Sequence, residues 1–289
     1  MYSLPSSYNK DFLPKSIPYG SLDIDTKEYC DRLIVNNGTV LRDYEIIALN
    51  YLIKQYKYYR LWDKLISYFP LLGGTGALGS KQNFQVNLIK TSPNLIYGAT
   101  LSDASCIAGG FRNVGGTSNG STSYIDSGIL HSTLDLENVG MSYYCRTEEI
   151  KSSIADMGVL ANNNIVRISL YSNYGSIYKY ASSEVGSYLI SSAQASYLKI
   201  KGYWSCNKIG QHLRLSHNGN IIANSIGTDR TSLAGNIYLG SMFRIGVGAV
   251  DLSTRTYGMF AIHKGYTPDE EKIRGRIEQE FQTLLNRAV

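Results

Sequence analysis

A glycine-rich stretch, GGTGALGSK from Gly73 to Lys81, is the first candidate for chemistry because it comes close to a phosphate-binding loop. Such a loop reads Gly-x-x-x-x-Gly-Lys-Ser/Thr and opens a helix, so that its lysine reaches the β- and γ-phosphates and its hydroxyl binds Mg²⁺. Here Ser80 precedes Lys81, which misplaces both groups, and the residues that follow, QNFQVNLIKTSP, look extended. We therefore predict a connecting turn rather than a nucleotide site.

Two other stretches match catalytic patterns only in part. GTSNG, from Gly116 to Gly120, fits the Gly-x-Ser-x-Gly nucleophile elbow, but that elbow precedes a helix, whereas the STSYIDSGI that follows has the pattern of a strand. DIDTKE, from Asp23 to Glu28, resembles the Glu-x-Asp-x-x-Glu strand of jelly-roll glycosidases, whose two carboxylates lie about 5 Å apart in one cleft. Its position in a proline-bearing N-terminal segment, outside the predicted sandwich, argues against glycoside hydrolysis.

The histidines and turn aspartates do not follow a known metal-site spacing. His212 and His217 are five residues apart on one predicted strand, so their side chains point to opposite faces. Aspartates in or near turns could bind a structural calcium ion, although no loop has the clustered oxygen ligands of an EF-hand. These aspartates are Asp126, Asp135, Asp229 and Asp251. Apart from that calcium option, the sequence assigns no catalytic residue, cofactor or metal.

Two groups of residues have the chemistry of a sugar-binding site, in which an aromatic ring lies beside amide and carboxylate groups. One group is Tyr203, Trp204 and Asn207 in GYWSCNKIG, and the other is Tyr171, Asn173 and Tyr174 in LYSNYG. The alternative is that these are ordinary strand and turn residues.

The composition favours a mostly β fold that would position these groups. The chain has 24 Tyr, 28 Gly and only 6 Pro, and tyrosine suits a half-buried pleated surface while glycine supplies turns. Short segments with a period of two follow one another from about residue 82, which predicts a sandwich or jelly roll. Asn218-Gly219 predicts a type I′ hairpin turn that pairs Leu215 with Ile222.

The ends of the chain differ from this body. Residues 1–40 hold three of the six prolines and predict an extended arm that docks on a partner surface. Residues 41–69 have apolar positions at three- and four-residue steps and predict a helical lead-in, and the jelly roll follows over residues 70–289. A C-terminal helix is expected over residues 267–286, with Thr267 as N-cap, Pro268 at its first position and Glu270 completing a capping box.

Charge and cysteine patterns exclude several classes of partner. The formal net charge is +5, but Lys and Arg are scattered rather than clustered, so we expect no nucleic-acid binding. No stretch approaches the ~18 apolar residues of a membrane span, and the N-terminus lacks the apolar core of a secretory signal. The four cysteines are far apart, which favours free thiols.

Several segments, taken in order, resemble one family. They are LWDKLISYFPLLGGT, VNLIKTSP, GGTSNGSTSYIDSGI, MSYYCRTEE and AIHKGYTPDEEKIRGRIEQEFQTLLNRAV. Over residues 41–289 they are similar to concanavalin A-like, LamG-type jelly-roll proteins of tailed bacteriophages, including crAss-like phages of gut Bacteroidetes. The Tyr-Ala-Asp hairpin of that family is replaced here by Tyr124-Ile125-Asp126.

The resemblance implies a non-enzymatic virion structural protein: a head fibre, a capsid decoration or a tail-associated protein. It would be assembled in the host bacterial cytoplasm, contact capsid, portal or tail proteins through the N-terminal arm, and form a symmetric oligomer, with a trimer as our first expectation. The alternative function is a carbohydrate-binding adhesin that recognises a host-surface glycan. A glycoside hydrolase or depolymerase is the third hypothesis, and it requires two carboxylates facing each other on the concave sheet.

Overall fold

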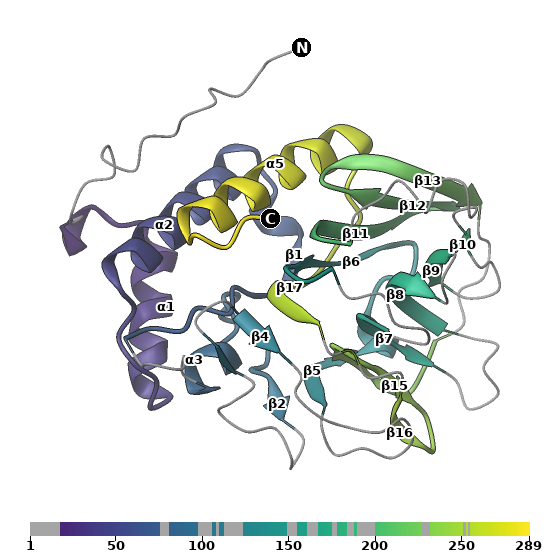
Figure 1. The fold of residues 1–289 in the computed structure, drawn as a ribbon, viewed down its shortest axis with the longest axis horizontal. Coiled ribbons are helices and arrows are strands. Elements are labelled where there is room, and N and C mark those ends of the chain that lie inside the picture. The colour runs from purple at the N-terminus through teal and green to yellow at the C-terminus, as the bar shows by residue number, and fades with distance from the viewer. Residues whose placement is uncertain are drawn as a thin grey trace.

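The computed structural model describes residues 18–75, 81–97, 106–107, 110–112, 124–148, 155–160, 167–174, 178–183, 188–189, 200–226, 232–250, 253 and 255–289; within 106–112 and 167–189 it describes the backbone. Two sheets pack face to face, and a layer of helices covers the outer face of one of them (Figure 1). No helix in these ranges is long and apolar enough to cross a membrane.

The sheet next to the helices, sheet A, is antiparallel, with the strand order β13-β12-β11-β6-β17-β4-β3 and with β1 also paired to β17. Its strands are β1 (Leu65–Phe69), β3 (Cys106–Ile107), β4 (Gly110–Arg112), β6 (Asn138–Cys145), β11 (Gly202–Ile209), β12 (His212–His217), β13 (Asn220–Ile226) and β17 (Thr256–His263).

Sheet B has the order β10-β9-β8-β7-β14-β5-β2, with β15 pairing parallel to β7 and antiparallel to β16. Its strands are β2 (Ile96–Tyr97), β5 (Ile125–Leu130), β7 (Met157–Leu160), β8 (Arg167–Tyr174), β9 (Tyr178–Ser183), β10 (Tyr188–Leu189), β14 (Asn236–Leu239), β15 (Met242–Arg244) and β16 (Gly248–Val250). The two sheets and the C-terminal helix confirm the predicted mostly β jelly-roll sandwich.

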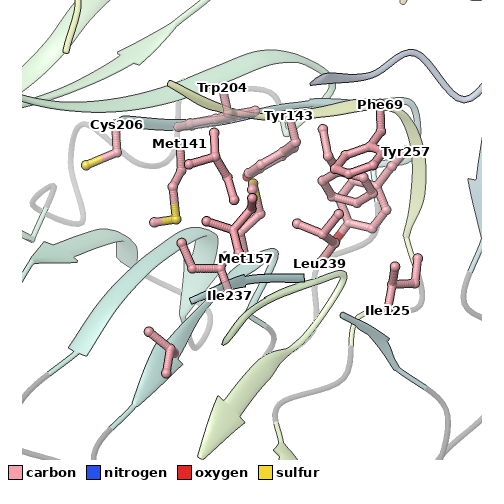
Figure 2. Packing of buried hydrophobic residues seen from close by; sticks show 14 of the residues in the cluster. Phe69, Ile125, Met141, Tyr143, Met157, Trp204, Cys206, Ile237, Leu239 and Tyr257 are labelled. Atoms are coloured by element: carbon pink, nitrogen blue, oxygen red, sulfur yellow. The ribbon is translucent and has the colours of Figure 1, made fainter. Parts of the chain in front are cut away.

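The space between the sheets is filled by alternate side chains of both. Met141 and Tyr143 of β6 point from sheet A toward Ile237 and Leu239 of β14 in sheet B (Figure 2). Cys145 of β6 belongs to the same buried cluster. This two-residue step is the one that a pleated strand imposes, and it agrees with the period of two predicted beyond residue 82. Burial of these apolar surfaces holds the two sheets together.

The outer face of sheet A is buried as well, under a helical layer of α2 (Asp43–Tyr58) and α5 (Pro268–Leu284), with α1 (Ile24–Val35) packed on α2. Tyr144, Tyr203 and Met259 project from sheet A into the same apolar cluster as Ile277 and Phe281 of α5. Sheet A therefore lies between two cores. Shorter helical segments are η2 (Tyr19–Ser21), η3 (Trp62–Lys64), α3 (Lys81–Gln85) and η5 (His131–Thr133).

Helix α5 begins as its sequence predicts. The Thr267 side chain accepts from the Glu270 N–H at 3.3 Å, the Glu270 carboxylate accepts from the Thr267 N–H at 2.8 Å, and Pro268 occupies the first turn. This capping box satisfies two backbone donors that a helix start leaves open. Lys64 adds an ion pair to Glu270 at 2.6 Å, which ties the start of α5 to η3.

A buried charged group fixes α5 on sheet A. The Arg274 guanidinium donates to Tyr56 Oη on α2 and to Ser142 Oγ on β6, both at 2.7 Å, and lies 4.7 Å from the ring centroid of Tyr266. The Glu278 carboxylate accepts from Tyr56 and, at 2.8 Å, from Tyr68 Oη of β1. Burial raises the pKa of Glu278, an effect that Arg274 and the tyrosine hydroxyls partly offset. Four elements thus meet at one polar network.

The N-terminal prediction is wrong for part of its range. Residues 24–35 of the predicted extended arm form α1, because Asp23 caps the helix and Tyr29 and Leu33 are buried against the helical layer. Residues 1–17 lie outside the described part of the chain. The predicted helical lead-in over 41–69 is helical to Tyr58, but residues 65–69 form β1, whose pairing with β17 is a tertiary effect.

The hairpin prediction is confirmed in its turn and corrected in its register. Asn218 and Gly219 have φ values of +51° and +76°, as a type I′ turn requires. Leu215 pairs with Ala223 instead of Ile222, because a bulge between Leu215 and Ser216 in the pairing shifts the register by one residue.

We expect Arg274→Met to destabilise the protein by about 3–5 kcal/mol, because it leaves the Glu278 carboxylate buried without its cation. The double variant Arg274→Met/Glu278→Gln removes both charges and should recover part of that loss. Urea unfolding followed by tryptophan fluorescence measures both. A single variant within about 1 kcal/mol of the wild type would show that the network contributes little.

Candidate functional site

The carboxylate of Glu45 occupies the backbone donors of the glycine-rich turn. The backbone N–H groups of Gly73 and Gly74 donate to Oε1 of Glu45 at 3.0 and 3.2 Å, and Gly74 has a φ of +67°. A carboxylate of α2 thus takes the two donors that a phosphate would need. Residues 76–80 lie outside the described part of the chain, and Lys81 begins the short helix α3, so the extended continuation expected from the sequence is wrong there.

The carboxylates of the glycosidase-like segment are structural. Asp23 accepts from the Asp25 N–H at 3.0 Å as the cap of α1 and pairs with Lys57 at 2.5 Å. Glu28 pairs with Lys90 at 3.0 Å. Because the segment is a helix start rather than a strand, its carboxylates do not alternate into one cleft. GTSNG, Gly116 to Gly120, lies outside the described residues.

The first predicted sugar-binding group is wrong. Tyr203 and Trp204 are 0% exposed and Asn207 is 1% exposed, so no ligand can stack on these rings. Trp204 donates to the Ile200 carbonyl at 2.6 Å from within the sandwich core, and the Asn207 amide donates to Glu271 of α5 at 2.9 Å. These residues build the two cores that enclose sheet A.

The second group lies on β8, where only the backbone is described. Tyr171 pairs with Tyr180 of β9, and Tyr174 pairs with Tyr178 across a bulge that contains Asn173. The side chains of Tyr171, Asn173 and Tyr174 lie outside the described part of the chain, so their proposed role stays a prediction.

The calcium option finds no support among the described aspartates. The Asp135 carboxylate accepts from the Glu137 N–H at 3.0 Å, and the Asp126 carboxylate accepts from the Gly128 N–H and the Asn236 amide. Within the described ranges, no three His, Cys, Asp or Glu side chains gather as metal ligands would. Asp229 and Asp251 lie outside these ranges.

The described thiols are free, as predicted. Burial raises the pKa of Cys30 to about 11 and of Cys145 and Cys206 to about 12. A thiol nucleophile needs a lowered pKa, so these three cysteines act as apolar packing groups.

A cluster of side chains on the outer face of sheet B is the strongest candidate for a binding site. We call it the sheet B cluster; it consists of Tyr124, Asp126, Asn236, Tyr238 and Phe243, the last of which also packs against the sandwich core. Ile125 of β5 and Ile237 and Leu239 of β14 point into the core. Their neighbours along the two strands, Tyr124, Asp126, Asn236 and Tyr238, therefore point outward. The register places Tyr238 directly opposite Asp126, which brings their side chains together on one face.

The aromatic part of the cluster is a stack. The rings of Tyr124 and Tyr238 lie 4.6 Å apart at an interplanar angle of 11°, and Phe243 lies 4.9 Å from Tyr238. Tyr238 is 7% exposed and packs on Ala249 of β16, whereas Tyr124 is half-buried. The pKa of Tyr238 lies above its usual value, mainly because the ring is buried and, to a smaller extent, because of the charge of Asp126 and the contact with Tyr124. Tyr124 is therefore the accessible ring, supported from below by Tyr238.

The polar part is held by a bulge. Asp126 Oδ1 accepts from the Gly128 N–H at 2.7 Å, and Oδ2 accepts from the Asn236 amide at 2.9 Å. Gly128 has a φ of +70°, and a Cβ there would lie 2.8 Å from Pro93. The irregular register between β5 and β14 leaves extra residues in β5, and the turn at Gly128 fixes the direction of the carboxylate.

His131 joins the two strands that carry the cluster. Its backbone N–H donates to the Gly235 carbonyl at 2.9 Å, and its Nδ1 accepts from the Leu233 N–H at 2.9 Å. An accepting Nδ1 requires the neutral ring. Burial, with a smaller contribution from Lys208, lowers the pKa of His131 to about 4.

Comparisons with known proteins add fold-level likenesses. No family model matches the chain, and no curated protein matches it. Domain 4 of the extracellular arabinanase AbnA from Geobacillus stearothermophilus, in complex with arabinotriose, is 12% identical, with 75% of this chain and 98% of that chain covered and a TM-score of 0.41. The Ruminococcus gnavus IT-sialidase CBM40 bound to α2,3-sialyllactose is 16% identical over 47% and 79%, with a TM-score of 0.34. The botulinum neurotoxin type G receptor-binding domain is 11% identical over 75% and 52%, with a TM-score of 0.37. At these scores the likenesses carry no argument about function.

Sequence reasoning missed the site but had a signal for part of it. In YIDSG, Tyr124 and Asp126 are two residues apart on a strand and so share a face. The sequence indicated Asp126 as a calcium candidate and as part of the Tyr124-Ile125-Asp126 hairpin, but not as a binding residue. Asn236 and Tyr238 lie 110 or more residues further along the chain, and only strand pairing brings them to the same place.

His131 predicts a pH dependence of stability. Its folded pKa, about 4, lies below the unfolded value near 6.5, so stability is fully present above pH 6.5 and falls as the pH drops toward 4. The loss is on the order of 3 kcal/mol. His131→Asn, whose Oδ1 can accept from the Leu233 N–H, should flatten that part of the curve. Urea unfolding from pH 4 to 8 measures it.

His263 contributes to the same slope, because burial holds its pKa well below the usual value. His212→Asn is the control, since His212 is exposed. If the free energy of unfolding falls equally with pH in the wild type and in His131→Asn, His131 is not the source of the pH dependence.

Proposed function

We propose that the chain is a non-enzymatic carbohydrate-binding protein and that the sheet B cluster binds the sugar. The observation that carries the proposal is the half-buried Tyr124 ring, stacked on Tyr238 beside the fixed Asp126 carboxylate. An aromatic face packs against the C–H groups of a pyranose, while a carboxylate and an amide take its hydroxyls. The cluster combines these groups on one surface.

The arrangement suits recognition because it is held before a ligand arrives. Tyr238 stacks on the Tyr124 ring, and the Gly128 N–H and the Asn236 amide hold Asp126. A ligand then orders few side chains on binding, which reduces the entropy cost of association. Each Asp126 oxygen has capacity for a further hydrogen bond from a sugar hydroxyl.

The cluster lacks the chemistry of a hydrolase among its described side chains. Glycoside hydrolysis uses a pair of carboxyl groups about 5–10 Å apart. The five described members of the cluster supply one, that of Asp126. We therefore propose binding without cleavage.

We further propose that the protein is part of a tailed-phage particle, as a fibre, decoration or tail-associated protein. The ordered resemblance of residues 41–289 supports this proposal. The order of the layers supports it too. The N-terminal helix α1 packs on α2, in the helical layer that covers the outer face of sheet A, whereas the cluster lies on the outer face of sheet B. Docking of the N-terminal region on other virion proteins, in an oligomer for which we propose a trimer, would leave the sugar site open.

Tyr124→Ala should weaken binding of a glycan identified on an array by about tenfold, because it removes the stacking surface. Tyr124→Phe keeps the ring and should retain most of the affinity. Isothermal titration calorimetry with the array hit measures both. Tyr58→Ala is a matched control, because Tyr58 is an exposed tyrosine of the helical layer. Unchanged affinity in Tyr124→Ala would remove this cluster as the site.

The particle proposal predicts a fixed copy number per virion. Quantitative mass spectrometry of density-purified phage should give copies in multiples that match capsid symmetry for a head protein, or about six or twelve for a tail protein. Absence of the chain from washed particles would contradict the proposal and leave the carbohydrate-binding proposal to stand alone.

A further inference from the structure

We infer that the sheet B cluster selects neutral sugars and discriminates against anionic ones, such as uronates and sialylated glycans. The inference rests on the proposed function, because it names the ligand class of the same site. It depends on the charge and fixed position of Asp126 beside the stacking ring of Tyr124.

The Asp126 carboxylate cannot turn away from a ligand on this face. One oxygen is held by the Gly128 N–H at 2.7 Å and the other by the Asn236 amide at 2.9 Å. Gly128 is itself fixed, because its φ of +70° and its contact with Pro93 require a glycine. The negative charge therefore has a constant place next to the rings.

This charge acts through a partly dehydrated environment. Asp126 is half-buried and lies opposite Tyr238, whose pKa it raises after the larger effect of burial. A like charge brought to about 6 Å from it, at an effective dielectric constant near 40, loses about tenfold in affinity. A sugar hydroxyl in the same place gains a charge-assisted hydrogen bond instead.

The Asn236 amide donates to the Asp126 carboxylate, and this bond decides which of its groups a ligand can reach. Asn236 donates one N–H to Asp126, which leaves its carbonyl oxygen as an acceptor and its second N–H as a single donor for a sugar hydroxyl. The two polar side chains thus present mainly acceptors, and acceptors suit the hydroxyl donors of a neutral sugar. A second carboxylate would find repulsion where a hydroxyl finds a partner.

The test uses matched probes: short neutral gluco- and galacto-oligosaccharides, each beside its counterpart oxidised to a uronate at C6. Calorimetry on the full chain at pH 7 compares the wild type, Asp126→Asn and the control Asp31→Asn. Asp31 lies on α1 in the helical layer, and Asn can still accept from Tyr19 there.

The wild type and Asp31→Asn should bind the neutral probe about tenfold more tightly than its uronate counterpart, and high salt should narrow that gap. Asp126→Asn should reduce this affinity ratio several-fold at low salt, because it removes the repulsion between Asp126 and the uronate. If Asp126→Asn does not fold, the salt dependence of the wild-type gap still tests the charge effect.

Two results have separate meanings. A wild type that binds uronates as well as or better than neutral probes, in a manner that Tyr124→Ala abolishes, overturns the selectivity and keeps the sugar site. A wild type that binds no probe of either class, on this set and on a broad array, overturns the proposed function itself.

Discussion

The structure depends on the burial of sheet A on both of its faces. A sheet with one solvated face would need polar outward residues, but here Tyr144, Tyr203 and Met259 lie on that face. They require the helical layer, and Arg274 fixes α5 there by bonding to α2 and β6 together. Removing α5 would expose a broad apolar surface, so the C-terminal helix is a part of the core rather than an appendage.

The same constraint decides which face is available for function. With sheet A enclosed, the outer face of sheet B carries the described polar and aromatic cluster. Its strands β5 and β14 are far apart in the chain but are held together from the inside by Ile125 and Leu239, and at one end by His131. The core thus positions Asp126 and Tyr238 from below, which is how a rigid sandwich can support a small exposed site.

Local signals were sufficient for the parts of the fold that local chemistry determines. The box at Thr267 and Glu270 and the turn at Asn218-Gly219 act within a few residues, and both could be predicted. Strand β1 and the bulge beyond Leu215 depend on partners distant in the chain, so the sequence indicated neither. The N-terminal helix was missed because prolines before it suggested an arm, whereas its stability comes from packing on α2.

The proposed sugar site shows why residue type alone was a poor guide in this chain. Among the described tyrosines, eight are buried in the two cores, as Tyr203 is. Polar neighbours such as Asn207 bond to a buried helix instead of a ligand. What separates Tyr124 is its face, since its neighbour Ile125 points inward and leaves the ring outside. The useful signal is therefore which set of alternating residues faces away from the core, combined with a carboxylate two residues from the aromatic ring. That set can be assigned only when one residue of the strand is known to be buried, and that knowledge comes from the packing of both sheets.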